Sequence, residues 1–166
     1  MQIGTQMWKI YLDTCCLNRF FDDQTQARVR SEREAVDTIL ETFRSGQWGW
    51  IISKVLEIEI SRNLNFDQYL RTKSLLARAN QTVLLTEAEK LRGLVLESLG
   101  FKSYDALHIA SAESGNADIL LTTDDRLLRR AKRVSTRLWV PVENPHVWLQ
   151  EVIRNGRAQN DRHRDL

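Results

Sequence analysis

The sequence predicts an α/β fold with a central parallel β-sheet. Short apolar segments of strand length alternate along the chain with longer segments of helical periodicity, which is the pattern of a parallel sheet. The length of 166 residues, with 42% hydrophobic residues, suits one domain with a substantial core. We therefore expect a single domain over residues 1–153. The polar segment 154–166 is predicted to be a frayed or disordered C-terminal tail.

Five segments have the apolar composition of strands buried in a parallel sheet. They are residues 8–12, 48–52, 82–85, 118–121 and 137–140. Ligands of such sheets bind beyond the carboxyl ends of the strands. Polar residues that directly follow a strand are therefore the first candidates for a functional site.

The segments between these strands carry helix signals. Residues 24–44 have apolar side chains at helical spacing. Ser53 is a predicted N-cap for a helix through residue 62, and Thr86 with Glu89 forms a predicted capping box for the helix that ends at Gly100. The remaining predicted helices are residues 66–79, 103–114, 124–133 and 144–153.

Composition excludes several classes of protein. No apolar run approaches the roughly 20 residues that span a bilayer, and the N-terminal segment lacks the features of a signal peptide, so no membrane contact is expected. Cys15 and Cys16 are adjacent and cannot close a useful disulfide loop, which indicates a reduced, cytoplasmic location. The net charge of +2 does not by itself indicate a nucleic-acid-binding protein.

Two aspartates follow predicted strands. Asp13 ends the first strand, and Asp124 comes just after the strand 118–121, behind Thr122 and Thr123. The alternative role for Asp13 is that of a helix N-cap, which aspartate often fills. Adjacent helical side chains diverge by about 100°, so we expect Asp124 to face the site. Asp125 is then either a residue that favours the helix start or a support for the site. Thr122 is also predicted to support the site.

The helix after Ser53 carries two glutamates that a helical wheel separates. Val55, Leu56, Ile58 and Ile60 define its predicted inward face, and Glu59 falls within that face. Glu57 falls on the solvated side. A glutamate on a buried face needs a cation or hydrogen-bond donors, so Glu59 is a candidate metal ligand. The alternative is a structural ion pair with an arginine.

Asp105 begins the segment DALHIASA, in which His108 is the only other ionisable residue. A helix of this composition is buried on nearly all sides. Asp105 could bind a metal or simply favour the helix start through the helix dipole. His108 shares its face and could orient Asp105, contact a phosphate, or be a hydrogen-bonded core histidine.

Carboxylates at strand ends, without a cysteine or histidine cluster, suit a hard cation such as Mg²⁺ or Mn²⁺. Such cations activate water and neutralise the charge of a phosphate, so phosphodiester hydrolysis is the predicted chemistry. The sequence has no GxxxxGK[ST] loop, which excludes a P-loop nucleotidase. A small-molecule phosphatase is a further alternative, but no DxDx[TV] motif supports it.

A row of arginines follows Asp124 on the predicted helix. From residue 126 to 137 there are six basic residues and no acidic one. Four of them recur at helical spacing and form one stripe: Arg126, Arg129, Arg130 and Arg133. Such stripes can bind the phosphates of RNA, although many charged runs are only a solvated helix face.

Four segments, taken together, resemble the PIN-domain family, which includes the VapC-like toxins of bacterial toxin–antitoxin pairs. They are IYLDTCCLN, ISKVLEIEI, SYDALHIASA and ILLTTDDRLLRRA, in matching order over residues 9–140. The resemblance implies a PIN-like three-layer α/β/α fold and an RNA-cleaving site that binds Mg²⁺ or Mn²⁺ through Asp13, Glu59, Asp105 and Asp124. It also implies a homodimer and an antitoxin partner that blocks the site.

Two positions depart from the pattern of that family. Many members carry Asn two residues after the first Asp, where this chain has Cys15; Asn18, in the following turn, is the candidate to replace it. Cys15 and Cys16 are otherwise interpreted as small core residues. Arg126 stands where a second acidic residue often follows the fourth motif Asp. The departures keep open an alternative function, a catalytically weak PIN-fold module that binds nucleic acid or an antitoxin.

Overall fold

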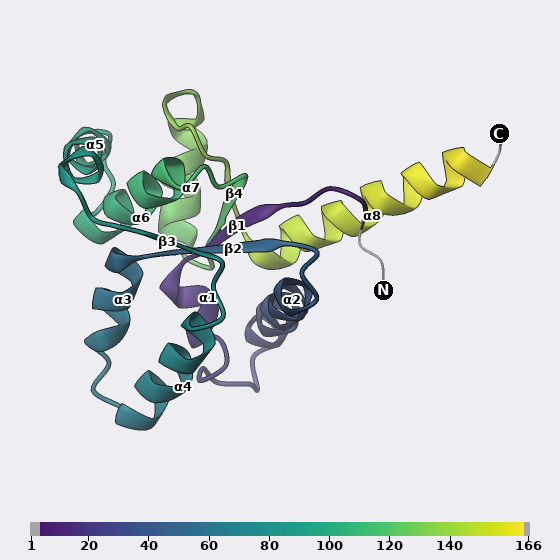
Figure 1. Cartoon of the computed structure of the whole chain (residues 1–166), viewed down its shortest axis with the longest axis horizontal. Coiled ribbons are helices and arrows are strands. Elements are labelled where there is room, and N and C mark those ends of the chain that lie inside the picture. The colour runs from purple at the N-terminus through teal and green to yellow at the C-terminus, as the bar shows by residue number, and fades with distance from the viewer. Residues whose placement is uncertain (1–3, 165–166) are drawn as a thin grey trace.

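The computed structural model describes residues 4–164 and contains a five-stranded sheet in the order β3-β2-β1-β4-β5 (Figure 1). All four pairings between neighbouring strands are parallel. The strands are β1 (Lys9–Leu12), β2 (Gly49–Ser53), β3 (Gln81–Val83), β4 (Ile119–Leu121) and β5 (Val142–Glu143). The predicted α/β fold with a parallel sheet is confirmed.

Helices cover both faces of the sheet. They are α1 (Thr14–Asn18), α2 (Ala27–Arg44), α3 (Lys54–Ser61), α4 (Phe66–Leu76), α5 (Glu87–Ser98), α6 (Ser103–Ser114), α7 (Asp125–Arg133) and α8 (Pro145–Arg164). Side chains alternate along each strand, so Ile10 and Leu12 of β1 pack in one core, whereas Tyr11 packs in the other. Helices α1 to α4 and α8 contribute to the first core, and α5, α6 and α7 to the second. The three-layer α/β/α arrangement is therefore as predicted.

The last predicted strand was misplaced. Residues 135–137 form a 3₁₀ turn, and the edge strand is β5, which begins after Pro141. β5 offers acceptors to β4: the backbone N–H of Leu120 donates to the Pro141 oxygen at 2.9 Å, and that of Thr122 to the Glu143 oxygen at 3.0 Å. A proline without an N–H is tolerated at such an edge position. The apolar residue Val140 is buried as a core contact, not as part of a strand.

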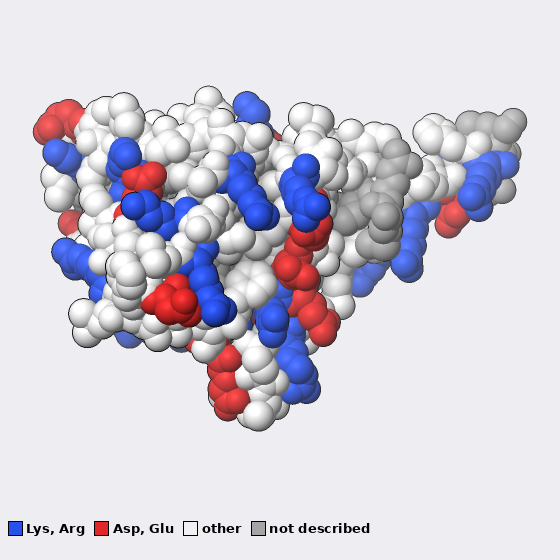
Figure 2. Space-filling model, turned by 60° about the horizontal axis from the view of Figure 1, so that its bottom comes forward, with Lys and Arg blue, Asp and Glu red and all other residues white. Residues whose placement is uncertain are grey.

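The final helix is longer than predicted. α8 runs to Arg164, where we expected it to end near residue 153. Its C-terminal half extends away from the sheet and carries exposed arginine side chains (Figures 1 and 2). The predicted division between a domain and a tail stays a prediction, and residues 165–166 of that tail lie outside the described residues. Within residues 4–164, no helix is both long and apolar enough to cross a membrane.

Glu89 fixes the start of α5 against the end of α6. The predicted capping box is present: the carboxylate accepts hydrogen bonds from the backbone N–H of Thr86 at 2.8 Å and from the Thr86 hydroxyl. It also accepts one from the Ser114 hydroxyl at 2.6 Å. The bonds from Ser114 and Thr86 lower the pKa of Glu89 to about 2.

The lowered pKa of Glu89 predicts a pH-dependent contribution to stability. Because the folded state favours the carboxylate, this stabilisation is complete above the ordinary pKa of 4.5 and is lost as the pH falls towards about 2. We expect Glu89→Gln to lower the free energy of unfolding at pH 7 by about 1 kcal/mol, with a smaller difference from wild type in acid. Urea denaturation across this range measures it, with the exposed Glu87→Gln as control. A pH-independent difference would contradict the assignment.

Candidate active site

A cavity of about 710 Å³ opens at the carboxyl ends of the strands. All four predicted carboxylates line it: Asp13, Glu59, Asp105 and Asp124. They come from the end of β1, from α3, from the first turn of α6 and from the junction between β4 and α7. The structure therefore brings together side chains that are far apart in the sequence, at the edge of the sheet where ligands of such folds bind. Asn18 also lines the cavity.

Asp13 is buried, and each of its two carboxylate oxygens accepts a hydrogen bond. Its Oδ1 accepts a hydrogen bond from the backbone N–H of Thr14 at 2.8 Å, so Asp13 is also the N-cap of α1. Its Oδ2 accepts from the Thr122 hydroxyl at 2.8 Å. The cap and the cavity are thus not exclusive alternatives, because one carboxylate takes part in both.

Cys15 lies on the wall of the same cavity, whereas Cys16 is buried in the core; both are free thiols. The Cys15 thiol lies 3.3 Å from Asp13 Oδ2 and 3.2 Å from the Thr122 hydroxyl. The backbone N–H of Thr123 donates to its sulfur at 3.2 Å. Cys15 packs against the core, as its interpretation as a small core residue expected, and its thiol in addition links the ends of β1 and β4 beside Asp13.

Glu59 is held by a buried chain of polar side chains. His108 Nε2 lies 3.2 Å from Glu59 Oε1, and His108 Nδ1 lies 2.6 Å from the Tyr11 hydroxyl. That hydroxyl is in turn 2.6 Å from Ser53 Oγ, the N-cap of the helix that carries Glu59. Of the roles predicted for His108, that of a hydrogen-bonded core histidine is confirmed, since His108 is fully buried; its hydrogen-bond partners are Glu59 and Tyr11, not Asp105.

The charged side chains in and beside the cavity shift one another's pKa values. Burial disfavours the charged forms of both Glu59 and His108, yet their mutual hydrogen bond and attraction lower the pKa of Glu59 and raise that of His108. Burial, together with repulsion from Asp13 and Asp124, raises the pKa of Asp105 to about 6. Repulsion of this kind between gathered carboxylates is relieved when a cation binds.

The helix-face argument for α3 was correct for its glutamates and wrong for Ile58. Glu59 lines the cavity, whereas the Glu57 carboxylate forms a surface ion pair with Lys54 at 2.7 Å. Ile58, predicted to face inward, is 43% exposed. The helix has only eight residues, and Val55, Leu56 and Ile60 are sufficient to fill its buried face.

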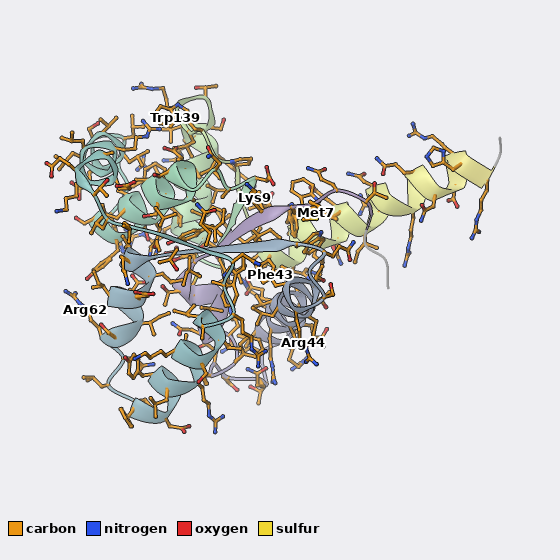
Figure 3. All side chains as sticks on the ribbon, viewed as in Figure 1. Met7, Lys9, Phe43, Arg44, Arg62 and Trp139 are labelled. Carbon is orange, nitrogen blue, oxygen red and sulfur yellow. The ribbon has the colours of Figure 1, made fainter. Side chains whose placement is uncertain are left out.

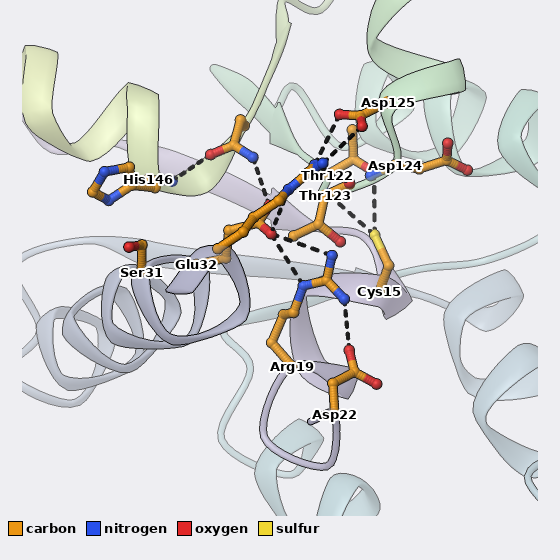
Figure 4. A network of polar contacts seen from close by, with 12 residues as sticks. Cys15, Arg19, Asp22, Ser31, Glu32, Thr122, Thr123, Asp124, Asp125 and His146 are labelled. Atoms are coloured by element: carbon orange, nitrogen blue, oxygen red, sulfur yellow. Dashed lines mark hydrogen bonds and ion pairs between the residues drawn. The ribbon is translucent and has the colours of Figure 1, made fainter. Parts of the chain in front are cut away.

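Asp124 and Asp125 point in different directions, as expected for neighbours at a helix start. Asp124 lines the cavity and is also the N-cap of α7, since its Oδ1 accepts from the backbone N–H of Arg126 at 2.8 Å. Asp125 binds Arg28 instead, with Nη1 and Nη2 donating at 2.7 and 2.8 Å (Figure 4). Arg28 Nη2 also donates to the Thr123 carbonyl at 3.0 Å, so this arginine fixes the β4–α7 junction from outside the cavity.

Behind that junction lies a buried glutamate that no local pattern predicted (Figure 4). Glu32 of α2 is 2% exposed. Its Oε1 accepts from Arg28 Nε at 3.0 Å and from Arg19 Nε at 3.2 Å, and its Oε2 accepts from Asn144 Nδ2 at 2.7 Å. The network joins the end of α1, α2 and the start of α8 around the acidic cavity.

The arginine stripe of α7 lies outside the cavity, because none of its four members is among the lining residues. Arg126, Arg129 and Arg133 are exposed. Arg130 is half-buried and packs over Gly100, where an added Cβ would meet the guanidinium carbon at 2.8 Å. Sequence reasoning missed another arginine, Arg62, which lines the cavity itself together with other polar residues that follow α3.

The donor set of the cavity fits a divalent cation. One ligand atom each of Asp13, Glu59 and His108 lie within 4.8 Å of one another, and Asp105 and Asp124 line the same space. Carboxylate oxygens suit Mg²⁺ and Mn²⁺, whereas both ring nitrogens of His108 are engaged by Tyr11 and Glu59. The metal-binding roles of these residues stay predictions.

Comparison with known proteins gives one family and several related folds. The sequence profile of the PIN domain matches residues 10–133. Curated proteins give no sequence match. Solved structures with a similar fold include a toxin–antitoxin complex from Klebsiella pneumoniae (TM-score 0.56, 18% identity, covering 82% of this chain and 97% of that chain). FitAcB from Neisseria gonorrhoeae is also similar (TM-score 0.52, 18% identity, covering 82% of this chain and 97% of that chain). So is VapBC2 from Rickettsia felis bound to a DNA fragment from their promoter (TM-score 0.52, 16% identity, covering 82% of this chain and 98% of that chain). At these identities the likeness shows a shared fold.

Proposed function

Because the chain belongs to the PIN-domain family, we propose that it is a metal-dependent endoribonuclease that hydrolyses RNA at the acidic cavity. The observation that carries the proposal is the convergence of Asp13, Glu59, Asp105 and Asp124 on one cavity at the carboxyl end of the sheet. Three of them also have roles at helix starts, but the repulsion among four carboxylates in one cavity is relieved when they bind cations.

The residues of the chain divide the work at such a site. Asp13, Glu59, Asp105 and Asp124 would hold Mg²⁺ or Mn²⁺, which when bound supplies charge neutralisation for the phosphate and activation of the attacking water. Thr122 orients Asp13 through its hydroxyl. The chain from Ser53 through Tyr11 to His108 orients Glu59. These buried hydrogen bonds keep the carboxylates in place before substrate binds.

We further propose that the protein acts as the toxin of a toxin–antitoxin pair, as a homodimer with an antitoxin partner. Support comes from the fold shared with a toxin–antitoxin complex and with a VapBC assembly. The cytoplasmic location inferred from Cys15 and Cys16 belongs to the same proposal. The alternative, a weakly catalytic binding module, draws on Cys15, whose thiol contacts Asp13 where a hard ligand would be expected.

Incubation of the purified protein with labelled single-stranded RNA tests the proposed activity. We expect cleavage within the chain in the presence of Mn²⁺ or Mg²⁺ and none in EDTA. Intact RNA in all metals, together with retained RNA binding, would instead support the binding module.

The stripe on α7 predicts a salt-dependent contribution to RNA binding. Replacing the exposed Arg129 and Arg133 with alanine should weaken binding, because fewer counterions are released when the RNA binds. The slope of log affinity against log salt should decrease in magnitude by about 1.4, at about 0.7 per phosphate contact on a single strand. Fluorescence anisotropy across a salt series measures this slope. An unchanged slope would show that the stripe is only a solvated face.

A further inference from the structure

The acidic cavity continues past the carboxylates to a wall of neutral and basic side chains. We call this the polar wall; it consists of Arg62, Asn63, Gln68 and Thr72, from the end of α3 and from α4. At about 710 Å³ the whole cavity has the size of sites that enclose an organic ligand, which is more space than metal ions need. The polar wall is therefore available to another part of the substrate.

Arg62, labelled beside α3 in Figure 3, is the only Lys or Arg among the described residues that line the cavity. Its guanidinium carbon lies 5.2 Å from the centre of the Tyr104 ring. Stacking on an aromatic ring covers one face of the guanidinium and leaves its N–H edge free for bidentate binding of an anion. Arg62 is also close enough to help lower the pKa of Glu59. A phosphate beside the acidic cluster would thus find one preoriented cation.

The amides of the polar wall are fixed in position yet keep unused hydrogen-bonding capacity. Asn63 Nδ2 donates to Gln68 Oε1 at 3.2 Å, and Asn63 Oδ1 accepts from the backbone N–H of Asn65 at 2.9 Å. Within the described residues, Gln68 Nε2 donates no hydrogen bond. The Thr72 hydroxyl donates to the Gln68 carbonyl at 2.9 Å and is buried, whereas Gln68 Oε1 accepts only one hydrogen bond from the described residues and keeps a second lone pair. The wall therefore presents a donor and an acceptor, as the edge of a nucleobase does.

We propose that the polar wall is a nucleotide subsite for single-stranded RNA. Arg62 binds a phosphate next to the scissile one, and Gln68 contacts the edge of the adjoining base. The Watson–Crick edge of a base is open to an amide only when the base is unpaired, and the major groove of duplex RNA is too deep and narrow for side chains, which favours a single strand. The proposal rests on the proposed function, because it places the scissile phosphate at the carboxylates. It assigns base selection to this cavity, whereas the arginines of the stripe on α7, outside the cavity, would contact phosphates.

The test compares Arg62→Ala with Arg71→Ala. Arg71 is an exposed arginine of α4 that pairs with Asp67 and does not line the cavity, so its removal is a matched loss of charge. We expect Arg62→Ala to weaken binding of a labelled RNA oligonucleotide in EDTA about tenfold, and to raise the KM of cleavage by a similar factor. Affinity for Mn²⁺ and the melting temperature should stay near those of wild type. Arg71→Ala should change RNA binding less than about twofold.

Gln68→Leu provides a second variant, which keeps both arginines. It should change the relative cleavage rates at different bases of a mixed-sequence RNA, while overall binding falls by less than about tenfold. Equal RNA binding by wild type and Arg62→Ala would overturn the subsite, as would equal losses in Arg62→Ala and Arg71→Ala. A polyglutamate peptide that bound as well as RNA and lost affinity equally in Arg62→Ala would show a protein-binding surface instead. Failure of wild type to cleave RNA would contradict the nuclease, whereas the binding comparison in EDTA would still judge the subsite.

Discussion

Replacing Asp13 with asparagine is expected to abolish metal-dependent RNA cleavage while leaving the metal-free protein at least as stable as wild type. Asparagine has nearly the same shape and can still accept the hydrogen bond from the Thr14 backbone N–H. Its amide can donate to the Thr122 hydroxyl, which then acts as acceptor. What is lost is one negative charge, which both binds the cation and repels the neighbouring carboxylates. The cleavage rate should fall by ~10²-fold or more.

The cleavage rate and the metal-free melting temperature of Asp13→Asn must be measured together. Asp67→Asn is a suitable control, because it makes the same chemical change at an exposed helix position outside the cavity. If Asp13 served only as the N-cap of α1, Asp13→Asn would keep full activity. Full activity would therefore exclude the site as assigned.

The largest effect on stability is expected at Glu32. Replacing it with alanine removes the shared acceptor of Arg19, Arg28 and Asn144 and leaves a cavity between α2 and its neighbours. Breaking a buried ion pair typically costs 3–5 kcal/mol, and both arginines are partly exposed, so we expect a loss of about 3 kcal/mol in the free energy of unfolding.

Asp125→Ala is the matched control for Glu32→Ala. It removes the other carboxylate partner of Arg28, but this pair is about half exposed on both sides, and its loss should cost less than about 1 kcal/mol. Urea denaturation of the two variants gives the comparison. Similar losses of unfolding free energy in both variants would show that burial does not make the Glu32 ion pairs more stabilising than the exposed pair of Asp125.

The sequence predicted the candidate site where local rules apply. Asp13 and Asp124 follow from the rule that ligands bind beyond strand ends, and Glu59 follows from the face of its helix. Each of these arguments needs only a few neighbouring residues. The same holds for the capping box of Thr86 and Glu89, which is present.

The features that the sequence did not predict depend on contacts between distant segments. Glu32 meets Asn144 only because α2 and the start of α8 pack on the same side of the sheet. His108 meets Glu59 because α6 and α3 come together at the end of β2, whereas helix periodicity could pair it only with Asp105. The edge strand β5 was missed because the apolar residues 138–140 have the composition of a strand, although Trp139 is exposed and only Val140 is buried.

The most direct measurement of the central claim compares Mn²⁺ binding with RNA cleavage over the same range of Mn²⁺ concentration. Calorimetry gives the binding isotherm, and a labelled single-stranded RNA gives the rate. If the carboxylates of the cavity bind the catalytic cation, half-maximal binding and half-maximal cleavage occur at the same concentration, and Asp13→Asn loses both. Cleavage that persists in EDTA would contradict the account. So would a wild-type protein that does not cleave RNA, together with Mn²⁺ binding that is unchanged in Asp13→Asn.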